Sequence, residues 1–328
     1  MRVLEVYNTH IIVAKGYTIF EINFSKNKIQ KLAKIHDIKN SIAASIPFIN
    51  RLFRLEVTKS YHLQDNSRLC IAKKGIFKLT NGERRFRKVM HITRGSRPLN
   101  ICQDNNKNMY FGEYFSNTEN APVNIYKSND QGENWNIVYT FPKGSINHIH
   151  GIFFDKFTDL LWIVTGDRDN ECIIGNSPDG FKTLNIIFQG GQEYRSCILL
   201  FYQDFIVFAT DSQYIQNSIK CFNRNTKTIK DLQTIQGSAI KGGQYGNVSF
   251  ISTTVEPSAI NKDIYSHLWI SKDGLIWKEY FSAKKDWLPS IFQFGSIEFP
   301  NYNYLSTRFF FYGRALNKIG GHTVEIEI

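Results

Sequence analysis

Short runs of alternating apolar and polar residues cover most of this chain. The first four, residues 2–8, 10–15, 18–24 and 28–35, have the two-residue period of strands that are buried on one face. Similar runs follow in groups of four, separated by turns rich in Gly, Asn and Asp. The predicted groups cover residues 53–92, 99–141, 148–188, 194–235 and 238–281, and residues 291–328 hold about three more strands. The second group is predicted to open with a strand over residues 53–62. The pattern therefore predicts an all-β protein.

One turn motif recurs between the third and fourth predicted strands of these groups. Residues 128–135 read S-N-D-Q-G-E-N-W, residues 177–181 read S-P-D-G-F, and residues 271–277 read S-K-D-G-L-I-W. In such a turn the Asp carboxylate accepts hydrogen bonds from backbone N–H groups, the Gly permits a positive φ, and the Trp opens the next strand. We therefore expect a strand-turn-strand clamp at each copy.

Weaker copies of this turn complete a regular spacing. The turn positions are 27, 81, 130, 179, 225 and 273, which are separated by 46 to 54 residues. A repeat of this length is typical of a β-propeller blade. We predict a β-propeller of seven blades, the last one short by a strand, and six blades are the alternative. No linker-like or low-complexity segment interrupts the chain, so residues 1–328 are predicted to form one domain.

The turn motif resembles the Asp-box (BNR repeat), S-x-D-x-G-x-x-W, of the β-propellers of sialidases and related carbohydrate-active proteins. The resemblance implies that Asp130, Asp179 and Asp273 are structural and lie on the face opposite the substrate. It also implies roles, because sialidases bind the substrate carboxylate with three arginines, use a Tyr–Glu pair as nucleophile and use an Asp as acid/base. The residues that could take these roles here are Arg97, Arg168, Arg195, Arg308 and Arg314 for the carboxylate, Tyr194, Tyr214 or Tyr245 as nucleophile, and Asp167 as acid.

Two sets of loops would build the ligand face of such a propeller. One set leads into the first strand of each blade, and the other joins the second strand to the third. The polar residues on these loops include Arg94, Arg97, His148, His150, Glu193, Tyr194, Arg195, Lys241, Gln244 and Tyr245 in the first set, and Glu113, Tyr114, Asp167, Arg168, Asp211, Gln213, Tyr214, Glu256 and Arg314 in the second. The corresponding loops between the second and third strands of the first two blades are short, so we expect any chemistry on blades three to seven.

The pair His148 and His150 is a candidate for metal binding or for base catalysis. Residues two apart in a strand share a face, so both imidazoles are expected to lie together. A metal would need a third ligand, for which Asp167 is the nearest candidate. The alternative is that both rings are packed beside a central channel and hydrogen-bonded to backbone. We predict no metal and no cofactor.

Composition changes this picture in three respects. The formal net charge of +11 favours an anionic partner, and because Lys and Arg are scattered we expect an acidic carbohydrate and no nucleic acid, although general surface charge explains the sign as well. The first residues alternate as a strand does and lack the apolar core of a signal peptide, and no run approaches a membrane span, so the expected location is the cytoplasm and the oligomeric state is unknown. The five cysteines occur singly and are expected to be buried free thiols.

Three functions follow from these residues. The first is a sialidase-like glycoside hydrolase that acts on an acidic sugar, for which two carboxyl groups are needed and Glu113, Asp167, Asp211 and Glu256 are available. The second is a polysaccharide lyase on uronic-acid glycans, with His148, His150, Tyr194 and Arg195 at its centre. The third is a non-catalytic glycan-binding or interaction propeller. The predicted catalytic residues are Asp167, Glu113, Tyr194, His148 and His150, and the predicted substrate-binding residues are Arg97, Arg168, Arg195, Asp211, Tyr214, Tyr245 and Arg314.

Overall fold

The computed structural model describes residues 1–26, 28–36, 43, 46–302 and 308–328. The chain forms two compact units, the first made of Met1–Arg97 with Ala283–Ile328 and the second of Pro98–Ser282. The predicted turn residue Asn27 lies outside the described residues. The one-domain prediction for residues 1–328 stays a prediction.

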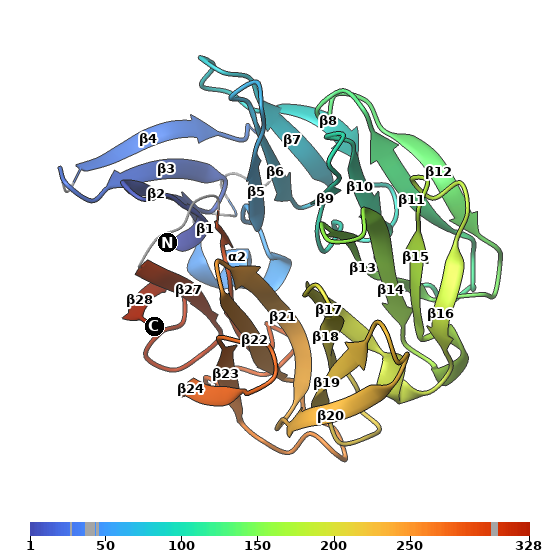
Figure 1. Ribbon diagram of the computed structural model, residues 1–328. Helices are drawn as coiled ribbons and strands as arrows, with labels where there is room; N and C mark the ends of the chain where they lie inside the picture. The colour runs from blue at the N-terminus through green and yellow to red at the C-terminus, as the bar shows by residue number, and fades with distance from the viewer. Residues whose placement is uncertain (27, 37–42, 44–45, 303–307) are drawn as a thin grey trace. The chain divides into compact units, whose positions relative to one another are not determined.

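The second unit consists of four groups of strands paired in chain order, and the first three groups are separate four-stranded antiparallel sheets (Figure 1). The strands of the first two groups are β9 (Cys102–Gln103), β10 (Met109–Gly112), β11 (Val123–Ser128) and β12 (Asn136–Phe141), then β13 (His148–Asp155), β14 (Leu160–Gly166), β15 (Ile173–Ser177) and β16 (Asn185–Gln189). The strands of the next two are β17 (Ser196–Phe201), β18 (Phe205–Thr210), β19 (Ser218–Asn223) and β20 (Ile229–Thr234), then β21 (Ser238–Tyr245), β22 (Val248–Val255), β23 (Tyr265–Ser271) and β24 (Lys278–Lys284). The 3-10 helices η1 (Asp169–Glu171) and η2 (Gln192–Tyr194) lie in the loops of this unit.

The first unit holds three groups of strands. The first two groups are β1 (Arg2–Val6), β2 (His10–Lys15), β3 (Thr18–Asn23) and β4 (Lys28–Lys34), then β5 (Lys59–His62), β6 (Arg68–Ala72), β7 (Gly75–Leu79) and β8 (Arg87–His91). The third group is β25 (Gly295–Glu298), β27 (Arg308–Arg314) and β28 (Thr323–Glu327), while the short β26 (Asn301–Tyr302) pairs in parallel with β1. Among the described residues the last group thus has three strands, as predicted. The β-propeller fold is confirmed, while the number of blades, seven or six, stays a prediction.

The predicted strand over residues 53–62 is wrong for most of its length. The segment contains the end of the helix α2 (Pro47–Phe53), and only Lys59–His62 forms a strand. Proline at the start of a helix loses no hydrogen bond, and apolar residues at positions 48, 49, 52 and 53 repeat with helical spacing. The alternation that indicates a strand begins only after the left-handed Arg54, where the helix ends.

The last strand of each group in the second unit is the most exposed strand of that group. In the second group β13 is almost wholly buried, whereas β16 is largely exposed. Apolar side chains on facing sheets pack together, as Ile125 of β11 does with Ile149 of β13 and Ile163 of β14. Buried first strands place the loops at their ends in the interior of the unit, where polar groups must find partners.

The three predicted turn clamps share a hydrogen bond from the Ser hydroxyl to the Asp carboxylate. Ser128 Oγ donates to Asp130 Oδ1 (2.8 Å) and accepts from Gly132 N (2.9 Å), and Trp135 Nε1 donates to the Gly132 carbonyl (3.1 Å). The turns at Asp179 and Asp273 repeat the Ser–Asp contact at 2.9 and 3.0 Å. Backbone N–H groups lower the pKa of Asp273 and Asp179, so these carboxylates are fixed by their turns.

Two further predictions concern cysteines and membranes. All five cysteines are unpaired, and all but the half-buried Cys197 are buried, which confirms free thiols. None of the helices in the described part of the chain has the length and apolar character needed to cross a bilayer.

Candidate functional site

Two histidines and an aspartate converge in the second unit. His148 and His150 lie at the start of β13, and Asp167 directly follows β14. The two Nε2 atoms are 3.1 Å apart, His150 Nε2 is 3.3 Å from Asp167 Oδ1, and His148 Nε2 is 3.5 Å from Asp167 Oδ2. The predicted grouping of these three side chains is therefore present.

Local strand geometry aims the two rings at each other. His148 pairs with Gly166, and the register of β13 and β14 shifts between Ile149 and Gly151, so His150 is the extra residue of a β-bulge. A Cβ on Gly166 would lie 2.6 Å from His150 Cε1, so only glycine leaves room for the ring there. Such bulges recur near the start of β17 and β21.

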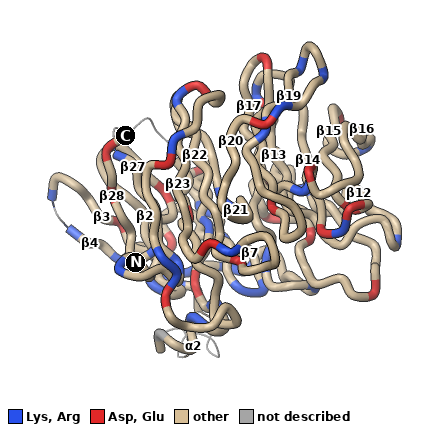
Figure 2. The backbone as a smooth tube through the Cα atoms, turned by 90° about the horizontal axis from the view of Figure 1, so that it is seen from below, with Lys and Arg blue, Asp and Glu red and all other residues tan. Residues whose placement is uncertain are grey.

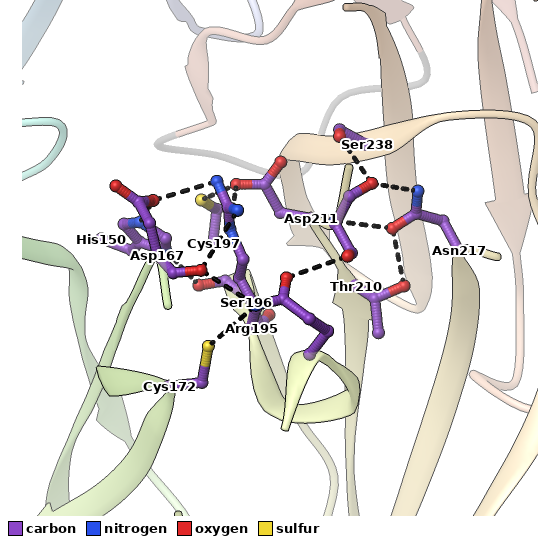
Figure 3. Close-up of polar contacts among 12 residues, drawn as sticks. His150, Asp167, Cys172, Arg195, Ser196, Cys197, Thr210, Asp211, Asn217 and Ser238 are labelled. Atoms are coloured by element: carbon purple, nitrogen blue, oxygen red, sulfur yellow. Dashed lines mark hydrogen bonds and ion pairs between the residues drawn. The ribbon is translucent and has the colours of Figure 1, made fainter. Parts of the chain in front are cut away.

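Arg195 links Asp167 to a second carboxylate. Its Nη2 is 2.9 Å from Asp167 Oδ1, and its Nε is 3.9 Å from Asp211 Oδ2. Figure 3 shows the guanidinium between the two carboxylates, with Cys197 beside them. Cys197 Sγ lies 3.3 Å from Asp211 Oδ2, and Asp211 Oδ1 is buried without a hydrogen-bond partner among the described residues. One guanidinium thus faces two carboxylates.

The charges around this cluster move the pKa values of its acids apart. Burial opposes the charge of Asp167, but its contacts with His148 and His150 outweigh burial and hold its pKa well below the usual range. Glu256, in the loop after β22, behaves oppositely: burial, and then the charge of Asp211, raises its pKa to about 7. Asp167 is therefore ionised at neutral pH, while Glu256 exchanges a proton there.

A buried polar network supports the loops that carry these acids. Asn217 Nδ2 donates to Asn261 Oδ1 (3.0 Å), and Asn261 Nδ2 donates to the Ser212 carbonyl (2.9 Å). Ser212 Oγ donates to Gln192 Oε1 (2.9 Å), and Gln192 Nε2 donates to the Asp167 carbonyl (2.9 Å). This chain of contacts ties together loops from three sheets, part of which is visible in Figure 3.

Several predicted site residues in the second unit do not join the cluster. Glu113 accepts a hydrogen bond from Asn124 N (2.8 Å), and the ring of Tyr194 stacks on Phe188 with centroids 5.1 Å apart. The sequence pattern predicts Tyr245 in a loop that leads into a blade, but it is the last residue of β21 and pairs with Val248. It lies seven residues beyond Ser238, or roughly 23 Å along an extended strand.

Arg168 and Tyr214 have exposed side chains on the loops that carry Asp167 and Asp211. The Arg168 side chain is 67% exposed and 3.6 Å from Glu171, and Tyr214 is 67% exposed. Both are therefore available to a ligand that approaches these loops.

Arg97 and Arg314 belong to the first unit, where they join a different cluster. Arg314 Nη2 and Arg2 Nη1 both bind Glu298, at 2.9 and 2.8 Å. Arg97 Nη1 is buried without a hydrogen-bond partner among the described residues, and burial together with Arg314 and Arg2 lowers its pKa to about 10. A cavity of about 350 Å³ in this unit is lined by Arg314 and by Asn50, Arg51, Glu56, Asp286, Gln293, Tyr312, Ala315, Leu316, Gly320 and Gly321.

Two groups of side chains in the described residues have the composition and spacing of metal ligands. One is His148, His150 and Asp167, and the other is His150, Cys197 and Asp211. The groups share His150, so one chain cannot use both fully. The sequence pattern predicts the first group but gives no sign of the second, because Cys197 lies 47 residues beyond His150 on another sheet.

Positive charge is distributed over the molecule. Figure 2 shows Lys and Arg positions along many segments of both units, interspersed with Asp and Glu. The net charge of +11 therefore does not by itself single out a docking surface.

Comparisons with known proteins support the fold. No protein-family model and no curated protein matches the chain. A chain of the mitotic checkpoint complex is similar over 100% of this chain and 89% of its own length, with a TM-score of 0.57 and 9% identity. A prolyl endopeptidase is similar over 94% of this chain, with a TM-score of 0.56 and 10% identity, although the match spans only 45% of that chain. At such identities the likeness shows a β-propeller-like fold and no activity.

Proposed function

We propose that the protein is a glycoside hydrolase that acts on acidic glycans, with Glu256 as proton donor and Asp211 as the second carboxyl group of the pair. The main support is a pair of carboxyl groups with different surroundings. Glu256 has a pKa of about 7, and Asp211 has a buried oxygen without a hydrogen-bond partner among the described residues. Glycosidic cleavage needs one acid that is protonated near neutral pH and one carboxylate that is not. We assign the acid role to Glu256 because of its raised pKa, and the second carboxyl role to Asp211 because its Oδ1 is buried without a hydrogen-bond partner among the described residues.

This proposal assigns the acid to Glu256 in place of Asp167. An acid must hold its proton until the glycosidic oxygen needs it, and the lowered pKa of Asp167 is unsuited to that task. Glu113 has its Oε2 occupied by a backbone N–H, so it is also a poor donor. Arg168 and Tyr214 remain as candidates for contact with the sugar, because both are exposed on the loops that carry Asp167 and Asp211.

Two weaker observations support a sialidase-like enzyme and an acidic substrate. The three Ser–Asp turn clamps have the arrangement expected of the Asp-box. The net charge of +11 favours an anionic polymer over a neutral one.

A test combines substrate screening with two variants and one control. Glu256→Gln and Asp211→Asn are each expected to lower kcat/KM by roughly 10²- to 10⁴-fold on any sialoside or ulosonic-acid glycoside that the wild type cleaves. Glu193→Gln removes an exposed carboxylate near Arg195 and should change kcat/KM by less than about twofold. Full activity in the Glu256→Gln variant would remove Glu256 from the mechanism. Saturable binding of the glycan without cleavage would favour a binding propeller.

A second candidate is a polysaccharide lyase, favoured by one contact. The rings of Tyr114 and His148 lie 4.3 Å apart between centroids, so a phenol and an imidazole stand together near Arg195, as proton abstraction from a uronic acid would need. The same screen separates the reactions, because elimination yields an unsaturated product that absorbs in the ultraviolet and hydrolysis does not.

A further inference from the structure

We propose that His148, His150 and Asp167 form a binding site for a divalent transition metal of the zinc class. The two Nε2 atoms are 3.1 Å apart, and each lies near a different oxygen of the Asp167 carboxylate, at 3.3 Å from His150 Nε2 to Oδ1 and 3.5 Å from His148 Nε2 to Oδ2. Tetrahedral ligands bound at about 2.0–2.1 Å stand about 3.3–3.4 Å apart, so one ion fits between the two imidazoles and the carboxylate with little movement. This inference is independent of the proposed hydrolysis.

Hydrogen bonds on the far side of both rings fix which nitrogen faces the ion. His148 Nδ1 lies 3.0 Å from the Phe115 carbonyl, and His150 Nδ1 lies 3.0 Å from the Ser196 carbonyl. A carbonyl can only accept, so both Nδ1 atoms carry hydrogen. In a neutral ring the Nε2 atom then carries no hydrogen and has a free lone pair. This is the tautomer whose Nε2 binds a metal.

Two lone pairs 3.1 Å apart repel each other unless a cation lies between them. The cation is either a proton, which makes one ring an imidazolium, or a metal ion that binds both rings and the carboxylate. The metal satisfies both rings and the carboxylate at once, whereas a single proton can lie directly between only one pair of these atoms. Imidazole and carboxylate together favour zinc over calcium or magnesium.

Burial and charge also suit an ion that enters from one side. His148 and His150 are 6% and 3% exposed, whereas the Asp167 side chain is 31% exposed. The site is therefore closed behind the rings and accessible at the carboxylate, which leaves a fourth position for water or substrate. Asn147 Nδ2 donates to Asp167 Oδ2 (2.7 Å) and Arg195 holds Oδ1, so the carboxylate has a fixed orientation.

The test measures zinc binding to the full chain after chelation and removal of any affinity tag. The wild type is expected to bind one Zn²⁺ per chain by calorimetry and elemental analysis. His148→Gln and Asp167→Asn should each weaken binding by about 100-fold or more, because each removes one ligand. His267→Gln is the matched control, since His267 contacts Asp263 (3.2 Å) and Glu279 (2.9 Å) and lies outside both groups of potential ligands, and it should leave the affinity unchanged.

Cobalt substitution identifies the ligands even if a variant fails to fold. Co²⁺ bound to the wild type should give a tetrahedral spectrum without a thiolate charge-transfer band. A thiolate band would overturn this ligand set in favour of the group that contains Cys197. Equal zinc binding by the wild type and Asp167→Asn, or no binding above that of Mg²⁺, would overturn the site altogether.

Discussion

Replacement of Glu256 by Gln should change how the stability of the protein depends on pH. Burial and the charge of Asp211 raise the pKa of Glu256 from the ordinary 4.5 to about 7, with Arg195 opposing and Asp167 adding to the shift. The folded state therefore keeps a proton that the unfolded chain loses above pH about 4.5. As pH rises from about 4.5 to about 7 this group destabilises the fold, and above pH 7 the penalty is constant.

The size of the penalty follows from the shift. One pKa unit corresponds to about 1.4 kcal/mol, so a rise from 4.5 to about 7 gives an upper limit of about 3–4 kcal/mol in the free energy of unfolding. Glu256 is only partly buried, so solvent screening reduces the expected value to about 1–3 kcal/mol. Gln keeps the shape of the side chain and has no charge to bury, so it should remove the pH-dependent part.

Urea unfolding at pH 4.5, 6 and 8 measures this difference. Relative to wild type, Glu256→Gln should gain about 1–3 kcal/mol between pH 4.5 and pH 8, and the gain should appear mostly below pH 7. Glu193→Gln, at an exposed carboxyl group, should show no such trend. A difference between Glu256→Gln and wild type that is the same at all three pH values would refute the raised pKa, and with it the argument for Glu256 as proton donor.

Three further substitutions test other parts of the structure by urea unfolding at neutral pH. Gly166→Ala should destabilise the folded protein by about 1–3 kcal/mol and shift the NMR signals of His150, because the new Cβ would lie 2.6 Å from that ring. Unshifted signals would contradict the close approach. Asp155→Asn should cost about 3 kcal/mol, because Asp155 is fully buried and 2.7 Å from an Arg224 nitrogen; a cost below about 1 kcal/mol would show that the ion pair adds little. Ser271→Ala should cost about 1–2 kcal/mol, because the buried hydroxyl makes two hydrogen bonds in its turn clamp, and no change would mean that the clamp is dispensable.

The sequence predicts the fold well because each blade signals its strands locally. Alternation of apolar and polar residues predicts a strand over residues 10–15, and β2 has these bounds. Where the local pattern is ambiguous the prediction is wrong, as at the helix α2. The polar and glycine residues 241–244, just before Tyr245, suggest a loop. In the structure these residues pair with β22, so the strand β21 continues as far as Tyr245.

The candidate site is predicted only in part, because its contacts join segments far apart in the chain. The pattern H-I-H and the layout of loops are enough to group His148 and His150 with Asp167. No pattern indicates that Asp211 has a buried oxygen without a partner among the described residues, or that burial, and then the charge of Asp211, raises the pKa of Glu256. These properties depend on burial and on distances between sheets, which a single sequence does not record.

The orientation of the two histidines shows how the propeller architecture supports the site. The carbonyl that holds His148 belongs to Phe115, 33 residues earlier, and the one that holds His150 belongs to Ser196, 46 residues later. One anchor comes from the loop after β10 and the other from the first residue of β17, so the sheets on both sides of β13 fix the two rings. The close approach of the two Nε2 atoms therefore depends on how three sheets pack together. A substitution that shifts the packing between these sheets should disturb the site even when it touches none of its side chains.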